Sequence, residues 1–264
     1  MTAPAISVDK LRRTPAVPLG RIFRVELRKM VDTRAGLWLF VAIGVLTAAA
    51  VVLFLIFAPP KELHFANFAG IALTPQGFLL PVLGILLITS EWAQRTGLVT
   101  FTQEPNRGRV VVAKTLSAVL VGVAAAALLL AVAGVGNVLG AALQDGVGGW
   151  DVSGGRAFLY VLILQVSGII QGLAFGMLLM NSAAAIVSYF VIPISFSIVF
   201  GTVPALAGVA PWIDLGTAQQ PLLEFDKAVS GMEWAQLAAT SAIWVGLLFT
   251  LGVVRLLRSE VRSA

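Results

Sequence analysis

The stretch Leu37–Phe57, LWLFVAIGVLTAAAVVLFLIF, contains no charged residue and is long enough to cross a membrane as a helix. A helix needs about 20 apolar residues to span the roughly 30 Å hydrocarbon core of a bilayer. Five more apolar runs of similar length follow, at Ile71–Ser90, Val110–Gly136, Ala157–Met180, Ala183–Thr202 and Ala235–Leu257. They are continuous rather than alternating, which favours helices over a membrane barrel. The sequence therefore predicts an all-α integral membrane protein with six transmembrane helices.

The composition agrees with this class. Hydrophobic residues make up 58% of the 264 residues and charged residues only 12%, and the mean hydropathy is +0.94, which together exclude an ordinary soluble domain. The chain has no cysteine, so disulfides and thiolate chemistry are excluded. The basic residues flank the apolar runs, which indicates contact with membrane lipids and not with nucleic acid.

The lysines and arginines predict the orientation. With a cytoplasmic N-terminus, all but three of the 18 lie on the inner side, the exceptions being Lys61, Arg156 and Lys227. Because cytoplasmic segments carry the excess of positive charge, we expect both termini in the cytoplasm.

Outside the spans, residues 1–18 and 259–264 are predicted to be cytoplasmic tails, the first of them disordered. Residues 19–36 are predicted to form an amphipathic interfacial helix that leads into the membrane domain of residues 37–258. Glu26, Arg28 and Lys29 are its candidate functional residues. Glu26 falls among the apolar positions of this helix. Either the helix frays there or Glu26 pairs with a neighbour such as Arg95, or Glu26 has a specific role in coupling.

Three connections are predicted on the outer side. Ala58–Gly70 and Leu139–Arg156 are expected to be short loops. Val203–Trp234 contains two apolar stretches, Pro204–Trp212 and Thr217–Phe225, that are each too short to cross a membrane. They predict a re-entrant helix pair between the fifth and sixth spans.

Several residues within the spans have two interpretations. Gly168, Gly172 and Gly176 recur every four residues, a small-residue pattern that allows close helix packing, either within the chain or against a second subunit. Gln165 and Gln171 either cross-link helices or line a substrate path, and Tyr189 is a further candidate for that path. The prolines, Pro75, Pro81 and Pro193, either bend helices statically or serve a moving gate.

Catalytic motifs are scarce. The segment Gly108–Thr115 approaches a phosphate-binding loop, but Ala113 replaces the glycine that lets the backbone curl around phosphates. The single histidine, His64, has only Glu62 nearby, so no metal site is expected. We therefore expect the chain neither to bind ATP itself nor to be an enzyme.

The longest inner connection follows the second span and has the sequence EWAQRTGLVTFTQEPNRGRVVVAK from Glu91 to Lys114. Glu91 and Arg95 are spaced to pair along a helix, which Pro105 would end. This segment resembles the permease subunits of ABC type 2 transporters, particularly the small six-span permeases of actinobacterial exporters. The resemblance lies in Glu91-Trp92, Thr96-Gly97, Pro105, Arg107-Gly-Arg109 and Ala113-Lys114.

The resemblance implies a transmembrane subunit of an exporter for drugs, peptides or lipid-like molecules in a bacterial plasma membrane. Two separate ATPase subunits would bind ATP and Mg²⁺, and a second permease copy, identical or similar, would complete the complex. The inner connection would dock on the ATPase as a coupling helix through Glu91, Arg95, Phe101, Glu104, Arg107 and Arg109.

Two alternatives remain from the sequence. A non-transporting membrane partner of an ABC ATPase, with a role in assembly or signalling, would share the docking segment. A lipid-modifying membrane enzyme would need clustered acids on a cytoplasmic loop to hold Mg²⁺, and the inner loops offer only Glu91 and Glu104.

Overall fold

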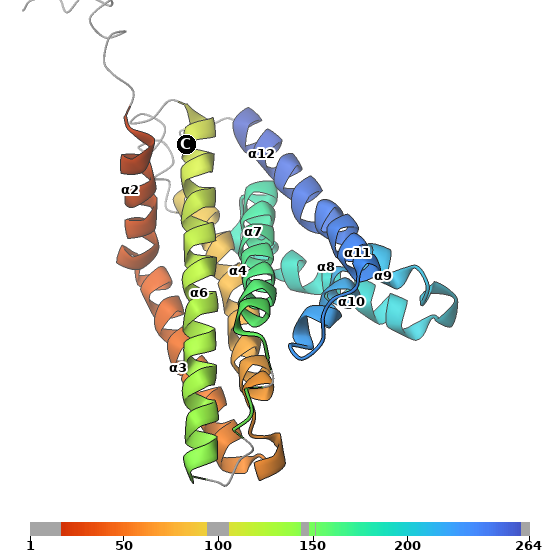
Figure 1. Cartoon of the computed structure of the whole chain (residues 1–264). Coiled ribbons are helices and arrows are strands. Elements are labelled where there is room, and N and C mark those ends of the chain that lie inside the picture. Colours follow the sequence, from red (N-terminus) through yellow and green to blue (C-terminus); the bar gives the residue numbers. More distant parts are fainter. Residues whose placement is uncertain (1–16, 94–105, 144–147, 151, 260–264) are drawn as a thin grey trace, which may run out of the picture.

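The computed structural model of the chain describes residues 17–93, 106–143, 148–150 and 152–259. These residues form helices and connecting turns, without a β-strand among them. The predicted all-α class is confirmed. Figure 1 shows several long helices that run roughly side by side, whereas the helices labelled α8 and α12 run obliquely to them.

Six helices are long and apolar enough to cross a membrane, as predicted. The first five are α3 (Arg34–Phe57), α4 (Phe65–Ala93), α6 (Arg107–Leu143), α7 (Gly154–Leu179) and α8 (Ser182–Thr202). The sixth combines α11 (Gly231–Ser241), the π-helical segment η4 (Ala242–Leu247) and α12 (Leu248–Arg258).

Two of the predicted outer loops are shorter than expected because neighbouring helices continue into them. α6 extends through Leu143, past the end of its apolar run, and the buried Asn137 in this extension donates to the carbonyl oxygens of Gly148 and Gly149, each at 3.4 Å. α4 begins at Phe65 instead of Ile71, with the side chains of Phe65 and Phe68 buried in the core. Polar and aromatic contacts therefore lengthen helices beyond what hydropathy alone indicates.

The helix α2 (Leu19–Asp32) matches the predicted amphipathic helix, although it ends at Asp32. Ile22, Glu26 and Met30 are its buried residues, spaced one turn apart along the face that contacts the bundle. Thr33 then caps α3, since its hydroxyl oxygen accepts from the amide of Gly36 at 3.1 Å.

Between the fifth and sixth spans lie four short elements, η2 (Pro204–Leu206), α9 (Ala210–Ile213), α10 (Leu215–Gln219) and η3 (Gln220–Leu223). They contact α8, α7 and α11 in one corner of the molecule (Figure 1). Short helices are thus present where they were expected, and their re-entrant position in a membrane stays a prediction.

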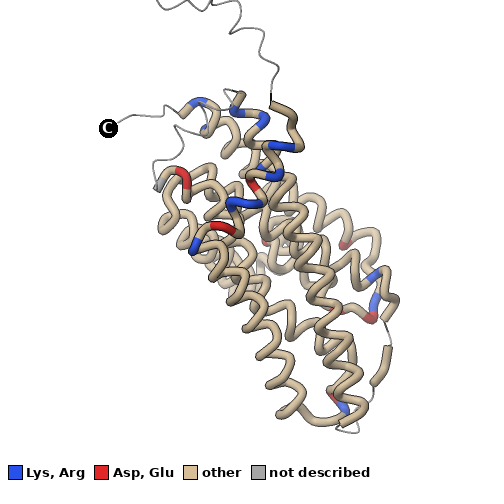
Figure 2. The backbone as a smooth tube through the Cα atoms, turned by 90° about the vertical axis from the view of Figure 1, so that its left-hand side faces the viewer, with Lys and Arg blue, Asp and Glu red and all other residues tan. Residues whose placement is uncertain are grey.

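The positive charges gather at one end of the bundle. Figure 2 shows lysine and arginine concentrated where α2 lies and where α6 begins, with few at the opposite end. Arg107 donates to the carbonyl oxygens of Leu256 at 3.3 Å and Ser259 at 2.6 Å, and Arg109 donates to that of Val17. Both ends of the described chain therefore lie at this basic end.

Candidate functional site

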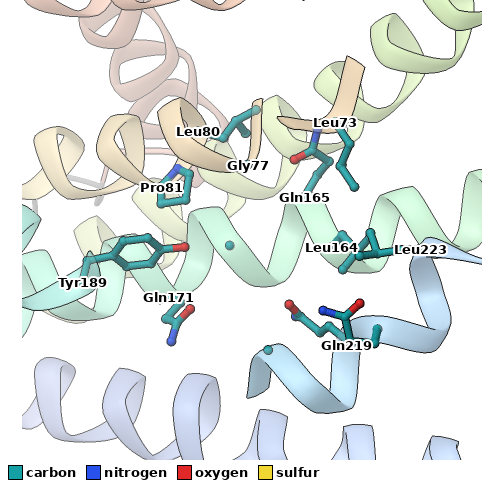
Figure 3. Close-up of a pocket in the computed structure, with 13 residues that line it drawn as sticks. Leu73, Gly77, Leu80, Pro81, Leu164, Gln165, Gln171, Tyr189, Gln219 and Leu223 are labelled. Atoms are coloured by element: carbon teal, nitrogen blue, oxygen red, sulfur yellow. The ribbon is translucent and has the colours of Figure 1, made fainter. Parts of the chain in front are cut away.

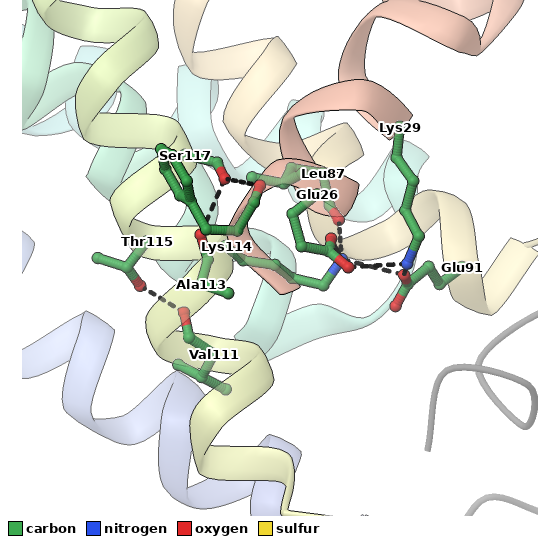
Figure 4. Close-up of polar contacts among 10 residues, drawn as sticks. Glu26, Lys29, Leu87, Glu91, Val111, Ala113, Lys114, Thr115 and Ser117 are labelled. Atoms are coloured by element: carbon green, nitrogen blue, oxygen red, sulfur yellow. Dashed lines mark hydrogen bonds and ion pairs between the residues drawn. The ribbon is translucent and has the colours of Figure 1, made fainter. Parts of the chain in front are cut away.

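Four charged side chains from three helices meet at the basic end of the bundle (Figure 4). The Lys114 ammonium of α6 lies 2.6 Å from the Glu26 carboxylate of α2 and 3.1 Å from the Glu91 carboxylate near the end of α4. The Lys29 ammonium lies 2.7 Å from Glu26 and 2.8 Å from Glu91. We call these four residues the inner ion cluster.

Because the cluster is buried, each of its charges destabilises the protein unless an opposite charge pairs with it. Glu26 is only 1% exposed and Lys114 only 3%, and each buried ion loses several kcal/mol of hydration. Among the described residues, two ammonium groups face two carboxylates. Lys114 also donates to the carbonyl oxygen of Leu87 at 3.0 Å, so its three N–H groups have three acceptors. The cluster therefore fixes α2, α4 and α6 relative to one another.

Lys29 forms the more exposed side of the cluster. Burial alone would lower the pKa of its ammonium, but the carboxylates of Glu26 and Glu91 outweigh this effect and hold that pKa above its usual value. Lys29 therefore stays charged throughout the physiological range and continues to neutralise the two acids.

The structure shows that Glu26 is paired, whereas its role in coupling stays a prediction. Its partners are Lys29 and Lys114, whereas Arg95 lies outside the described residues. Lys114 was not among the predicted site residues. The available signal was a lysine within the third apolar run, because an ionisable residue there requires a partner or a function. Gly108–Thr115, the near match to a phosphate-binding loop, lies wholly within the helix α6.

The other predicted coupling residues divide into two groups. Arg95, Phe101 and Glu104 lie outside the described residues. Arg107 and Arg109 contact backbone carbonyls of this chain, at the end of α12 and just before α2 respectively. Arg28 forms only an exposed pair with Asp32 at 3.7 Å.

A second candidate site is a cavity of about 270 Å³ in the middle of the bundle (Figure 3). We call it the amide cavity because glutamines from α7 and from the short elements line it. It brings together the three residues predicted for a substrate path, Gln165, Gln171 and Tyr189. The remaining lining residues are Leu73, Gly77, Leu80, Pro81, Leu164, Gly168, Gly216, Gln219, Gln220 and Leu223.

Hydrogen bonds hold two of these amides in place. The Gln165 side-chain amide donates to the side-chain oxygen of Gln76 in α4, and both residues are buried. Gln219 donates to the Ser167 hydroxyl at 3.1 Å. In contrast, Nε2 of Gln171 is buried and has no hydrogen-bond partner within the described part of the chain. An unsatisfied buried donor costs about 1–3 kcal/mol, so Gln171 would gain from an acceptor that reaches its Nε2.

The repeated glycines of α7 pack within the chain, as one of their two interpretations expected. A Cβ atom on Gly172 would overlap the carbonyl oxygen of Pro81 in α4, and one on Gly176 would lie 3.0 Å from that of Ile85. Gly168 faces Pro81 and the Tyr189 hydroxyl more loosely, at 3.5 and 3.9 Å. These glycines let α4 and α7 approach closely beside the amide cavity.

Asp214, which the sequence did not single out, fixes the short elements beside the cavity. Its carboxylate is buried and accepts from the Ser197 hydroxyl at 2.9 Å, and from the amide and hydroxyl of Thr217 at 2.8 and 2.6 Å. Asp214 thereby caps α10 and ties it to α8. In the sequence, Asp214 lies between the two apolar stretches Pro204–Trp212 and Thr217–Phe225 without a distinctive pattern.

Neither a protein family model nor a curated protein sequence matches this chain. Its function is therefore inferred from the inner ion cluster, the amide cavity and the resemblance of the inner connection.

Proposed function

We propose that this chain is the transmembrane permease subunit of an ATP-driven ABC exporter in a bacterial plasma membrane. It would move a drug, a peptide or a lipid-like molecule, with energy from two separate ATPase subunits that bind ATP and Mg²⁺. Support comes from the six apolar helices, from the basic end that gathers both ends of the described chain, and from the resemblance of the segment Glu91–Lys114.

The observation that carries the proposal is the position of the inner ion cluster. Glu91 lies near the end of α4 and Lys114 near the start of α6, so the cluster flanks both sides of the connection that would dock on the ATPase. Glu26 extends the same cluster to α2. A displacement of the connection would therefore move three helices together.

α4 links this cluster to the amide cavity. The same helix that carries Glu91 also contributes Leu73, Gly77, Leu80 and Pro81 to the cavity wall. Pro81 has no amide hydrogen, so α4 lacks one backbone hydrogen bond there and bends at lower cost. ATP-driven movement at the inner end would thus shift the population of cavity conformations, which is the requirement for transport.

The proposed topology places the basic end and both termini in the cytoplasm, with the short elements η2 to η3 on the outer side. A second copy of the permease, identical or similar, would complete the path. At about 270 Å³ the amide cavity lies just below the usual range for drug-sized ligands. A larger substrate would need space contributed by the second copy.

Phe101 in the inner connection provides the test. If this connection docks on an ATPase, Phe101→Ala removes about 1–3 kcal/mol of contact energy. We expect normal expression, but strongly reduced co-purification with the ATPase or reduced substrate-stimulated ATP turnover. Phe57→Ala is the matched control, because Phe57 is exposed at the far end of α3. Equal complex formation and turnover in both variants would contradict the proposal.

Glu91→Lys is a less suitable test of docking. It would place a third ammonium group against Lys29 and Lys114 and would disrupt the fold at the inner ion cluster. Phe101 avoids this complication because the substitution changes no charge.

Because the cavity is small for a transported molecule, the chain could instead be a non-transporting membrane partner of an ABC ATPase. Such a protein would retain ATPase docking and its dependence on Phe101, yet show no stimulation of ATP turnover by any transported molecule. Substrate-stimulated turnover in a reconstituted complex therefore distinguishes the two functions.

A further inference from the structure

The amide cavity has no charged residue in its lining. It lies about halfway along helices that are long enough to cross a membrane. Its lining consists of leucines, glycines, glutamines, one proline and one tyrosine. Two acids lie close in sequence to the lining residues. The exposed Glu224 pairs with Lys227 at 2.6 Å, and the carboxylate of the buried Asp214 accepts hydrogen bonds from Ser197 and Thr217. A charged ligand would lose its hydration in this cavity without gaining a counter-charge, which disfavours ions strongly.

The cavity nevertheless offers hydrogen bonds. Gln171 is 4% exposed, and its Nε2 has no partner among the described residues. Figure 3 shows Gln171, Gln219 and Tyr189 around the same space. Amide N–H groups of this kind recognise hydroxyl or carbonyl oxygens of a neutral ligand.

The entrance of the cavity is on the outside of the bundle. Gly77, Gly216 and Leu223 line the cavity and are exposed. Beside Gly77, the exposed Phe78 stacks on Phe190 of α8, with ring centroids 5.8 Å apart. Gln220 is a polar exposed residue of the lining, and the rest of the rim is apolar. A ligand with an apolar tail could therefore reach the polar interior from the surrounding hydrocarbon.

From this geometry we propose that the amide cavity binds the uncharged, hydroxyl- or carbonyl-bearing head of an amphiphile whose apolar tail lies along the rim. The volume of about 270 Å³ suits a single small head group. The identification of this amphiphile as a transported substrate rests on the proposed exporter function, whereas binding itself needs only the permease.

The binding test uses the full chain in nanodiscs without any ATPase. The probe is octyl glucoside carrying a diazirine in its tail, and the competitors are octyl glucoside, octyltrimethylammonium and octyl sulfate. We expect saturable photolabelling of α4, α7 or α8, competition by octyl glucoside, and at least about tenfold weaker competition by both charged amphiphiles.

Two variants change the cavity in different ways. A Cβ atom on Gly77 meets no atom within 4 Å, so Gly77→Leu fills the entrance without breaking helix contacts and should weaken labelling by about tenfold. Gln171→Leu removes the unpartnered donor; it should weaken labelling by about two- to tenfold while the free protein keeps or gains stability. Gly70→Leu is the control, because Gly70 is equally open on α4 but lies outside the cavity.

Selective, saturable labelling that both cavity variants weaken and Gly70→Leu does not would support the site. Labelling that does not saturate, equal competition by the charged amphiphiles, or full labelling in both variants would overturn it. These results are independent of ATPase docking, so a failed binding test leaves the Phe101 experiment unaffected, and failed docking leaves the binding result unaffected.

Discussion

Glu26 and Lys114 are 88 residues apart in sequence, yet their side chains form a buried ion pair of 2.6 Å between α2 and α6. This ion pair connects α2, which lies along the outside of the bundle, to the long apolar helix α6. Lys29 and Glu91 also belong to this cluster, so removal of any one of the four changes the charge balance among the described residues.

Loss of Lys114 should therefore destabilise the protein strongly. Lys114→Met leaves two buried carboxylates with one ammonium, and breaking a buried pair in this way costs about 3–5 kcal/mol. The free energy of unfolding, measured by denaturant titration in bicelles, reports the loss. Arg28→Met should change it by less than about 0.5 kcal/mol, because the Arg28–Asp32 pair is exposed.

Restoring the charge balance should recover stability. In the double variant Lys114→Met with Glu26→Gln, Lys29 still neutralises Glu91. We expect the double variant to be more stable than Lys114→Met alone, because uncompensated charge is the main cost. A double variant as unstable as the single one would show that packing around Lys114, and not charge, holds the three helices together.

Close packing of α4 on α7 gives a third prediction. Gly172→Ala would bring a Cβ atom into the carbonyl oxygen of Pro81, and since both are backbone-anchored the helices must separate. Overpacking of this kind costs about 1–3 kcal/mol. Gly44→Ala makes the same chemical change on α3 with no atom within 4 Å, and should leave the free energy of unfolding nearly unchanged. Equal stability of the two variants would contradict the observed contact.

Hydropathy alone predicted all six long helices, because continuous apolar runs of this length have few other structures available in a membrane protein. It could not predict their partners. The sequence showed that Glu26 was out of place, but only the fold brings it to Lys114. Likewise, the sequence predicted a substrate path for Gln165, Gln171 and Tyr189 one by one. Their shared cavity depends on how α7 packs against α4 and α8. Asp214 had no distinctive pattern, since its three hydrogen bonds come from residues on two elements.

Asp214 should be essential for the short elements beside the cavity. Asp214→Ala removes the acceptor of three hydrogen bonds. The Ser197 hydroxyl and the Thr217 amide and hydroxyl then lose their acceptor, which should lower the free energy of unfolding by about 2 kcal/mol or more. Limited proteolysis should then cut between α8 and α11 faster than in the wild type. Asp226→Ala, at an exposed position in the same connection, is the control. Unchanged cleavage in Asp214→Ala would mean that neighbouring packing alone fixes α10.

The orientation can be tested directly because the chain has no cysteine of its own. Single cysteines replace Asp226, between η3 and α11, and Arg258, at the end of α12; both positions are exposed and lie at opposite ends of the sixth span. The excess of lysine and arginine at the basic end predicts that this end faces the cytoplasm. In intact cells, a membrane-impermeant maleimide should therefore label Asp226→Cys and not Arg258→Cys, while both should react after the membrane is permeabilised. The reverse pattern would place the basic end outside, and a separate ATPase in the cytoplasm could then no longer reach the connection between α4 and α6.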